Sequence, residues 1–259
     1  VGDMSIWFFL VGILLISVIF FAYSIFVILK QKRLSEMQRD FINNMTHEFK
    51  TPIASITIAA DVISNPETIS EPSRILTYGS VIKSEVSRLN DQVDKVLQIA
   101  RIEKSGFHLR IESLDLNEII RQITQNYLAN NSGKLAITLA LSPGSITIKA
   151  DRMHLSNIFY NLFDNAMKYA GENPEIKLTS TQKDNRVIVV VSDNGPGIDR
   201  VHQKRIFQKF YRVPTANIHD VKGFGLGLFY VKSICEAHHW KITLDSASAA
   251  GATFILEIP

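Results

Sequence analysis

One histidine of this chain stands among side chains that can assist phosphate chemistry, in the run Asn44-Met45-Thr46-His47-Glu48-Phe49-Lys50-Thr51-Pro52. A solvated imidazole has a pKa near 6.5, so it is substantially neutral at pH 7 and one ring nitrogen can attack an electrophile. On a helix, residues two positions apart are separated by about 200°, so His47 faces water if Met45 and Phe49 face a core. This predicts a nucleophile, although the run by itself favours an ordinary surface histidine.

Two neighbours of the histidine can take part in the same chemistry. Glu48 can hold the proton of the second ring nitrogen and so favour the reactive tautomer. Thr51 lies one turn along on the same face, where its hydroxyl can position a water molecule near a phosphorylated histidine. Pro52 cannot donate a hydrogen bond to the Glu48 carbonyl, which predicts a kink or a local loosening of the helix.

A second group of polar side chains lies within the amphipathic run Asn157–Tyr169. Asn161, Asn165 and Lys168 are spaced i, i+4 and i+7, so all three share one helix face. Amide oxygens beside an ammonium suit Mg²⁺ and the phosphates that it bridges, because Mg²⁺ prefers oxygen ligands. The alternative is a solvated polar face, although asparagine is an indifferent helix former.

Two glycine-containing segments lie further along the chain. The first, Asp193-Asn194-Gly195-Pro196-Gly197, ends an apolar run and is either a simple turn or a site where Asp193 accepts a hydrogen bond from an adenine amino group. The second, Gly223-Phe224-Gly225-Leu226-Gly227-Leu228, opens onto an apolar helix whose free backbone N–H groups would favour phosphate. It is not a P-loop, because no Gly-Lys-Ser/Thr comes after it, and by itself this signal is weak.

The segment between these two glycine runs is typical of a loop that closes over a ligand. Ile206–Arg212 carries aromatic residues, and 213–222 shows little periodicity. We expect Lys209 or Arg212 to lie near phosphate.

The first of the elements that must position these residues is an uncharged run, Ile6–Leu29. As a helix it would be roughly 36 Å long, enough to cross a hydrocarbon core of about 30 Å. A signal peptide or a buried core helix are the alternatives, but the run ends on Lys30, Lys32 and Arg33, which predicts a cytoplasmic C-terminal portion. We expect a transmembrane helix and flank over 1–30, in a bacterial cytoplasmic (inner) membrane. Since the sequence starts at Val1, we expect a piece of a longer protein whose sensor is missing.

Residues 31–105 predict a helical hairpin. A helix over 31–65 and a second one ending near Lys104 are separated by a loop bracketed by Asn65-Pro66 and Glu71-Pro72. One hairpin leaves each apolar seam with a single partner, so we expect a homodimer that forms a four-helix bundle. The seams are Ile42, Met45, Phe49, Ile53, Ile56, Ala60 and Ile63, and then Ile75, Ile82, Val86, Leu89, Val93, Val96 and Ala100.

Residues 106–259 are numerous enough for an independent domain. Their mixture of strand-like and amphipathic runs predicts an α+β sandwich, one sheet with helices on one face. The expected strands are 137–141, 146–150, 175–180, 187–192, 240–245 and 253–258, and the expected helices lie near 117–130, 154–169 and 226–237.

Composition limits the function classes. With 28 basic against 25 acidic residues, nothing suggests a nucleic-acid partner bound by bulk electrostatics. The single cysteine, Cys235, excludes an internal disulfide framework and fits a reducing compartment.

Taken in order, the motifs from Phe41 to Leu228 resemble the sensor histidine kinases of two-component systems. The run from His47 to Pro52 resembles the phosphoacceptor box of that family, with Phe49 in place of the more usual leucine. The resemblance implies an ATP-binding domain, of the type shared with gyrase, MutL and the Hsp90 chaperones, that moves against a dimeric helical hairpin. The nucleotide-binding positions that it implies are Asn161, Asn165, Lys168, Tyr169, Asp193, Gly195, Gly197, Arg212, Gly223, Gly225, Leu226 and Gly227.

The resemblance also implies roles for these residues. Asn161 would bind Mg²⁺, Asn165 and Lys168 would contact phosphates, Tyr169 would lie near the ribose and Asp193 would read the adenine. Phosphate would pass from ATP to His47 and then to an aspartate of a response regulator. In that scheme Glu48 assists the transfer and Thr51 supports dephosphorylation of the regulator.

Three other functions fit some of the same motifs, and one of them is a variant that acts mainly as a phosphatase on its partner. An ATP-driven conformational machine would share the nucleotide motifs but would not use the histidine. A membrane scaffold with a degenerate kinase domain would not bind ATP. No separate signal-relay domain fits between Leu29 and Phe41, so the membrane helix is expected to run nearly straight into the hairpin.

Overall fold

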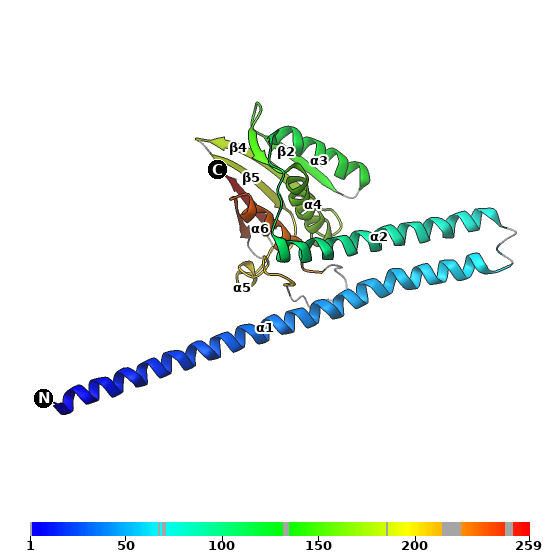
Figure 1. Cartoon of the computed structure of the whole chain (residues 1–259). Coiled ribbons are helices and arrows are strands. Elements are labelled where there is room, and N and C mark those ends of the chain that lie inside the picture. Colours follow the sequence, from blue (N-terminus) through cyan, green and yellow to red (C-terminus); the bar gives the residue numbers. More distant parts are fainter. Residues whose placement is uncertain are drawn as a thin grey trace. The chain divides into compact units, whose positions relative to one another are not determined.

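The computed structural model describes residues 2–66, 68, 71–131, 135–184, 186–213, 224–246 and 251–259 (Figure 1). The chain divides into two compact units, Val1–Met45 and Thr46–Pro259. The second unit contains the hairpin from Thr46 onward and the α+β portion.

Helix α1 (Gly2–Ser64) begins with the apolar run and contains Pro52 without an interruption of the helix. Its side chains from Ile6 onward are largely exposed, and its most apolar window has a mean hydropathy of 2.8. Among the described residues it is the one helix long and apolar enough to cross a membrane by length and composition. The expectation that the apolar helix continues directly into the next helix is confirmed.

The hairpin is completed by α2 (Pro72–Ser105), which begins with proline in its first turn, where the missing N–H costs nothing. Ala59 and Ile99 are buried, with exposed fractions of 1% and 4%. Neither belongs to the predicted seams, whose members Ile53 and Val93 are 52% and 43% exposed. This exposure is expected for a single hairpin, because each of its helices has one partner helix to cover its apolar stripe.

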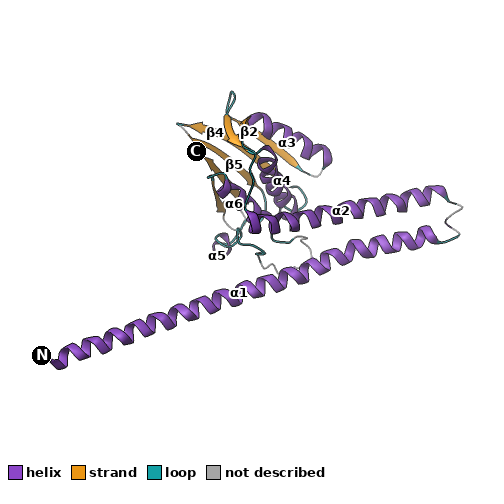
Figure 2. Cartoon of the chain, viewed as in Figure 1, coloured by secondary structure: helices purple, strands orange, loops and turns teal. Residues whose placement is uncertain are grey.

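The α+β portion is built on a sheet of five strands in the order β2-β4-β5-β7-β6 (Figure 2). Only the β2–β4 pair is parallel, with Ile137 opposite Ile176, and the other neighbours are antiparallel. The strands are β2 (Ala136–Leu141), β4 (Glu175–Lys183), β5 (Arg186–Asp193), β6 (Lys241–Ser246) and β7 (Ala252–Ile258).

Two strands lie outside this sheet. β3 (Thr147–Ala150) pairs with β1 (Glu112–Asp115) in a separate antiparallel ribbon, so the prediction of a single sheet is wrong. β1 was not predicted because four residues with one buried side chain, Leu114, give no periodic signal.

The helices α3 (Leu116–Asn130), α4 (Arg152–Tyr169) and α6 (Gly227–Ala237) cover one face of the five-stranded sheet. The strands show this directly, because burial alternates along β4 and β7 with the period of two that a half-covered sheet requires. A short helix, α5 (Arg200–Gln203), was not predicted. The expected sandwich with helices on one face is confirmed.

The core lies between α4 and the sheet. Leu155, Ile158, Phe159 and Phe163 of α4 are 0–1% exposed, and their i, i+3, i+4 and i+8 spacing gives α4 one fully buried side. Asp151 begins the helix by accepting a hydrogen bond from the backbone N–H of His154 at 3.0 Å. Because one side of α4 is buried against the sheet, the side chains on its opposite side have a fixed direction.

Replacement of Phe163 by alanine tests this packing. Phe163 is 0% exposed and its ring meets that of Tyr127 edge-on at 5.2 Å, so Phe163→Ala should lower the free energy of unfolding by about 3–5 kcal/mol. Denaturant unfolding of the detergent-solubilised chain measures the change. Val201→Ala, at a side chain that is 73% exposed, is the control and should change it by less than about 0.5 kcal/mol. Equal effects of the two substitutions would contradict the proposed core.

Candidate nucleotide and phosphoacceptor site

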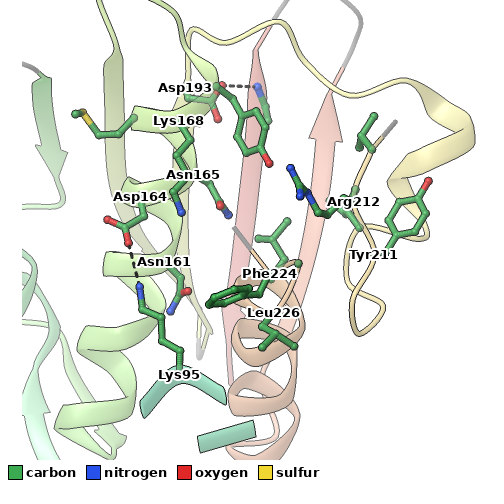
Figure 3. A pocket seen from close by; sticks show the side chains of 18 of the residues that line it. Lys95, Asn161, Asp164, Asn165, Lys168, Asp193, Tyr211, Arg212, Phe224 and Leu226 are labelled. Carbon is green, nitrogen blue, oxygen red and sulfur yellow. Dashed lines mark hydrogen bonds and ion pairs between the residues drawn. The ribbon is translucent and has the colours of Figure 1, made fainter. Parts of the chain in front are cut away.

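A cavity of about 660 Å³ lies beside the polar side of α4 (Figure 3). Its walls come from α2, α4, the end of β5 and the start of α6. Ten of the residues expected to bind nucleotide line it: Asn161, Asn165, Lys168, Tyr169, Asp193, Gly197, Arg212, Gly225, Leu226 and Gly227. Gly223 lies outside the described residues.

The asparagines and the lysine of α4 point from one helix face toward the cavity, as their spacing predicts (Figure 3). The Asn161 side chain is oriented by its own helix, because its Nδ2 donates to the Asn157 carbonyl at 2.7 Å. Its Oδ1 would lie only 2.8 Å from a Cβ on Gly227, so the glycine lets the first turn of α6 approach the amide. Asn161 Oδ1 is an oxygen of the kind that a hard cation such as Mg²⁺ prefers.

Side chains of both charges line the cavity: the cations are Arg88, Lys95, Lys168 and Arg212, and the carboxylates are Glu48, Asp91, Asp164 and Asp193. Although Lys168 as a residue is exposed, desolvation of its ammonium lowers its pKa, and the carboxylates of Asp164 and Glu48 oppose that shift. The nearby cations Lys95 and Arg212 add to the lowering. Lys95, Lys168 and Arg212 repel one another, and Asp164, which lies 3.8 Å from the Lys95 ammonium, offsets part of that repulsion.

Asp193, at the end of β5, is held by two backbone donors. Its Oδ1 accepts from the N–H of Gly195 at 2.9 Å and from the N–H of Ala252 at 3.0 Å. Among the described residues no hydrogen bond ends on Oδ2, which leaves one carboxylate oxygen as an acceptor for a ligand in the cavity. Gly195 therefore serves the site through Asp193, and does not itself line the cavity.

The glycine run before α6 passes very close to the aromatic segment. Gly225 has a φ of 68°, and a Cβ there would meet the Phe210 carbonyl carbon and the Tyr211 oxygen at 2.9 Å. The two segments are joined by a hydrogen bond from Phe210 N–H to the Gly225 carbonyl at 3.1 Å. Lys209 and Arg212 were the two cations expected near phosphate. Arg212 lines the cavity, whereas the Lys209 ammonium lies 4.5 Å over the Phe210 ring.

The phosphoacceptor box lies on α1. His47 is exposed and does not line the cavity, whereas Glu48 does. The Glu48 carboxylate, 14% exposed, lies 4.0 Å from the guanidinium of Arg88 on α2, and its expected contact with the imidazole stays a prediction. Thr51 Oγ1 donates to the backbone carbonyl of His47 at 3.4 Å, which places its hydroxyl beside the histidine.

Sequence reasoning missed several residues of the cavity. The Tyr127 hydroxyl donates to Asp164 Oδ1 at 2.9 Å, and Lys95 of α2 lies 3.8 Å from Asp164 Oδ2. Burial and then the Asp164 carboxylate raise the pKa of Tyr127. These side chains come from three helices and share no spacing, so no sequence pattern could have found them. Gly251, whose φ is 77°, was also missed, and it leaves room for the Asp193 carbonyl.

Two family models match this chain. Residues 150–259 match the histidine kinase-, DNA gyrase B- and HSP90-like ATPase family, and residues 37–105 match the His Kinase A (phospho-acceptor) domain.

Individual proteins agree with these matches. Sensor protein RprX of Bacteroides fragilis is 39% identical over 95% of this chain and 48% of its own length, so the chain spans about half of that relative. The crystal structure of full-length ShkA in complex with AMPPNP is 28% identical, with a TM-score of 0.61 over 84% of this chain and 45% of ShkA. Histidine kinase ThkA in complex with response regulator protein TrrA is 27% identical, with a TM-score of 0.60 over 88% and 63%.

The fold and the two matched domains define a histidine kinase catalytic portion. The chain belongs to the sensor histidine kinases of two-component systems, and the resemblance inferred from its ordered motifs is confirmed.

Two glycines of similar backbone conformation test the close approach at Gly225. Gly171 has a φ of 78° with nothing within 4 Å, so Gly171→Ala should cost only the left-handed backbone penalty of about 1–2 kcal/mol. Gly225→Ala should cost that penalty plus about 1–3 kcal/mol, because the backbone of Phe210 and Tyr211 must move. Denaturant unfolding measures both, and equal losses would show that the contact is unimportant.

Proposed function

We propose that this chain is the catalytic portion of a membrane-anchored sensor histidine kinase that transfers the γ-phosphate of ATP to His47. The observation that carries the proposal is the convergence of Asn161, Lys168, Asp193 and the Gly225 turn on one cavity, in a chain that also carries an exposed histidine in a phosphoacceptor box. The cavity volume, about 660 Å³, is within the range of small-molecule sites.

The residues that line the cavity favour one orientation of ATP. Asp193 Oδ2 would accept a hydrogen bond from the adenine amino group at the β5 end, with Gly197 beside it and Tyr169 near the ribose. The phosphates would then lie toward Asn165, Lys168, Arg212 and the start of α6, where ammonium, guanidinium and free backbone N–H groups favour anions. Gly225, Leu226 and Gly227 let the backbone approach these phosphates.

Mg²⁺ fits the residues that line this end of the cavity. It prefers oxygen ligands, keeps several waters and is commonly held through substrate phosphates, so one amide oxygen such as that of Asn161 suffices. Within the described residues no group of three or more His, Cys, Asp or Glu side chains could hold a metal, which agrees with a cation bound mainly through nucleotide. The ion would neutralise charge that develops on the transferred phosphoryl group.

The proposed reaction has two transfers. A neutral ring nitrogen of His47 forms a bond to the γ-phosphorus as the bond to ADP breaks, and Glu48 supports the proton on the other nitrogen. An aspartate of a response regulator then attacks the same phosphorus and frees the imidazole. The similarity to ThkA, whose structure contains the response regulator protein TrrA, supports this kind of partner. Thr51, beside His47, would position water for dephosphorylation of the regulator.

Exposed apolar surface supports the proposed assembly and location. The half-exposed Val86 and Val93 of α2 and Ile53 of α1 would be covered by a second hairpin, which supports a homodimer. The apolar start of α1 supports insertion into the bacterial cytoplasmic membrane, with the catalytic portion in the cytoplasm. No nucleic-acid partner is proposed.

Labelling with γ-phosphate-tagged ATP tests the acceptor. The full chain should acquire an acid-labile, base-stable label that His47→Gln abolishes, because glutamine has no nucleophilic nitrogen. His108→Gln, at another exposed histidine, is the control and should keep the label. Label that survives His47→Gln contradicts the proposal. ATP turnover without label would indicate a conformational machine, and absence of ATP binding a scaffold.

Adenine recognition is tested at Asp193. In Asp193→Asn the amide oxygen can still accept the two backbone hydrogen bonds, but an NH₂ group then faces the adenine amino group. We expect ATP affinity to fall at least about tenfold, which corresponds to roughly 1.4 kcal/mol. Asp184→Asn, at an exposed turn, should leave the affinity unchanged. Fluorescent-nucleotide displacement measures both, and unchanged affinity in Asp193→Asn would exclude Asp193 as the adenine acceptor.

A further inference from the structure

The Tyr230 hydroxyl lies where the C-terminal part of α2 meets the α+β portion. Tyr230, on α6, is 4% exposed. Its hydroxyl oxygen lies 2.6 Å from Nε2 of Gln98 on α2, 3.1 Å from Nδ2 of Asn157 and 2.9 Å from Nδ1 of His154, both on α4. Gln98 is thus joined to Tyr230 across 132 positions of sequence.

The balance of donors and acceptors around this hydroxyl fixes the state of His154. A tyrosine hydroxyl has one hydrogen and two lone pairs, and the amide groups of Gln98 and Asn157 both donate to it. Its own hydrogen must therefore go to His154 Nδ1, which has to be an unprotonated acceptor. A protonated His154 would present a third donor to an oxygen with two lone pairs.

The segment that connects α2 to β1 is fastened at the same place. The Phe107 ring packs edge-on against His154 at 5.2 Å and lies 6.2 Å from the Tyr230 ring. The backbone N–H of Arg110 donates to Asp151 Oδ2 at 2.8 Å. The connection is therefore held by these contacts, and both Gln98 and Lys95 supply side-chain contacts from α2 to the α+β portion.

The charges facing His154 favour its neutral form. Burial lowers the pKa of His154 most, the Asp151 carboxylate opposes this, and His238 adds to the lowering. Burial also lowers the pKa of His238, which must itself be neutral, because its Nε2 accepts from the Asp151 N–H at 3.0 Å. Neutral His154 is therefore compatible with its surroundings, and protonation is opposed.

In the arrangement that contains these contacts, the histidine of the phosphoacceptor box does not line the cavity. One turn before Gln98, Lys95 lies against Asp164, and the cavity is lined from the hairpin side by Glu48, Arg88 and Lys95 but not by His47. The Gln98–Tyr230 hydrogen bond fastens α2 to the α+β portion in this arrangement.

We propose that the Gln98–Tyr230–His154 hydrogen-bond cluster is a latch that holds the ATP-binding domain in a resting position and must open before the γ-phosphate reaches His47. Gln98 and Tyr230 are positioning residues and do not line the cavity. The inference rests on the proposed function, since it assigns this contact a role in controlling the same transfer.

Distance measurements between spin labels test the latch independently of catalysis. The native Cys235 is fully buried, so labels can be placed at Ser84→Cys on α2 and Glu172→Cys beyond α4, both exposed. With the doubly labelled full chain diluted in excess unlabelled chain, we expect one main distance within a chain, which Gln98→Leu and Tyr230→Phe should broaden and lengthen. Gln122→Leu, which removes an amide that bonds Glu118 and Arg152 elsewhere, is the control and should change nothing.

Kinetics of the same variants test the direction of control. Gln98→Leu and Tyr230→Phe should raise the initial rate of His47 phosphorylation about fivefold, the factor that corresponds to loss of one hydrogen bond of roughly 1 kcal/mol, at an unchanged KM for ATP. Unchanged distances, or a rate that falls, would overturn the latch. If the parent chain shows no label at His47, the proposed function fails, while the distance data still decide whether the contact exists.

A pH series tests the role of His154. Because its pKa is lowered when the latch is closed, closure is favoured above the ordinary value near 6.5 and is lost as the pH falls below it. The label distance should therefore lengthen between about pH 7 and pH 5. His154→Asn keeps an acceptor near the Nδ1 position but does not titrate, so its distance should stay short. Since His238 remains in that variant, an unaltered pH response would overturn the assignment to His154.

Discussion

The packing of α4 against the sheet is the constraint on which the rest of the site depends. Leu155, Ile158, Phe159 and Phe163 leave the helix no freedom to rotate, because any turn would expose them to water at about 1.5–3 kcal/mol each. With that face fixed, Asn161, Asn165 and Lys168 must lie on the cavity side. Burial of the apolar face of α4 thus holds its polar residues at the wall of the cavity. Inside the core the same residues would cost stability.

Close backbone approach completes the site. Gly225 and Gly251 both have positive φ and lie against other backbone, at Phe210 and at Asp193. Because glycine has no side chain to interfere, these contacts bring the end of β5, the aromatic segment and the start of α6 to one cavity. The charge balance of the whole chain is unremarkable, but Lys95, Lys168 and Arg212 gather at that cavity. Four carboxylates, Glu48, Asp91, Asp164 and Asp193, line the same cavity, so individual cations can contact the phosphates of ATP although the lining carries no excess of positive charge.

The sequence could predict a feature of this structure when the residues that form it lie close together in the chain. Periodicity predicted α4 and the shared face of Asn161 and Lys168, since residues of one helix have fixed relative positions. The Asp164–Lys95 and Tyr230–Gln98 contacts were invisible, because they join helices whose relative position is set only by tertiary packing. The four-residue β1 and the Asp193–Ala252 hydrogen bond escaped for the same reason. Features set by local spacing were therefore predictable, whereas features that depend on packing between distant elements were not.

The central claim is that this cavity delivers phosphate to one particular imidazole. Mass spectrometry of the full chain after incubation with Mg-ATP, with peptides handled at neutral or basic pH to preserve phosphohistidine, tests that claim directly. We predict a single phosphorylated site on the peptide that contains His47, with fragment ions that place the phosphate on its imidazole. Phosphate on a different residue, or none despite bound ATP, would contradict the claim.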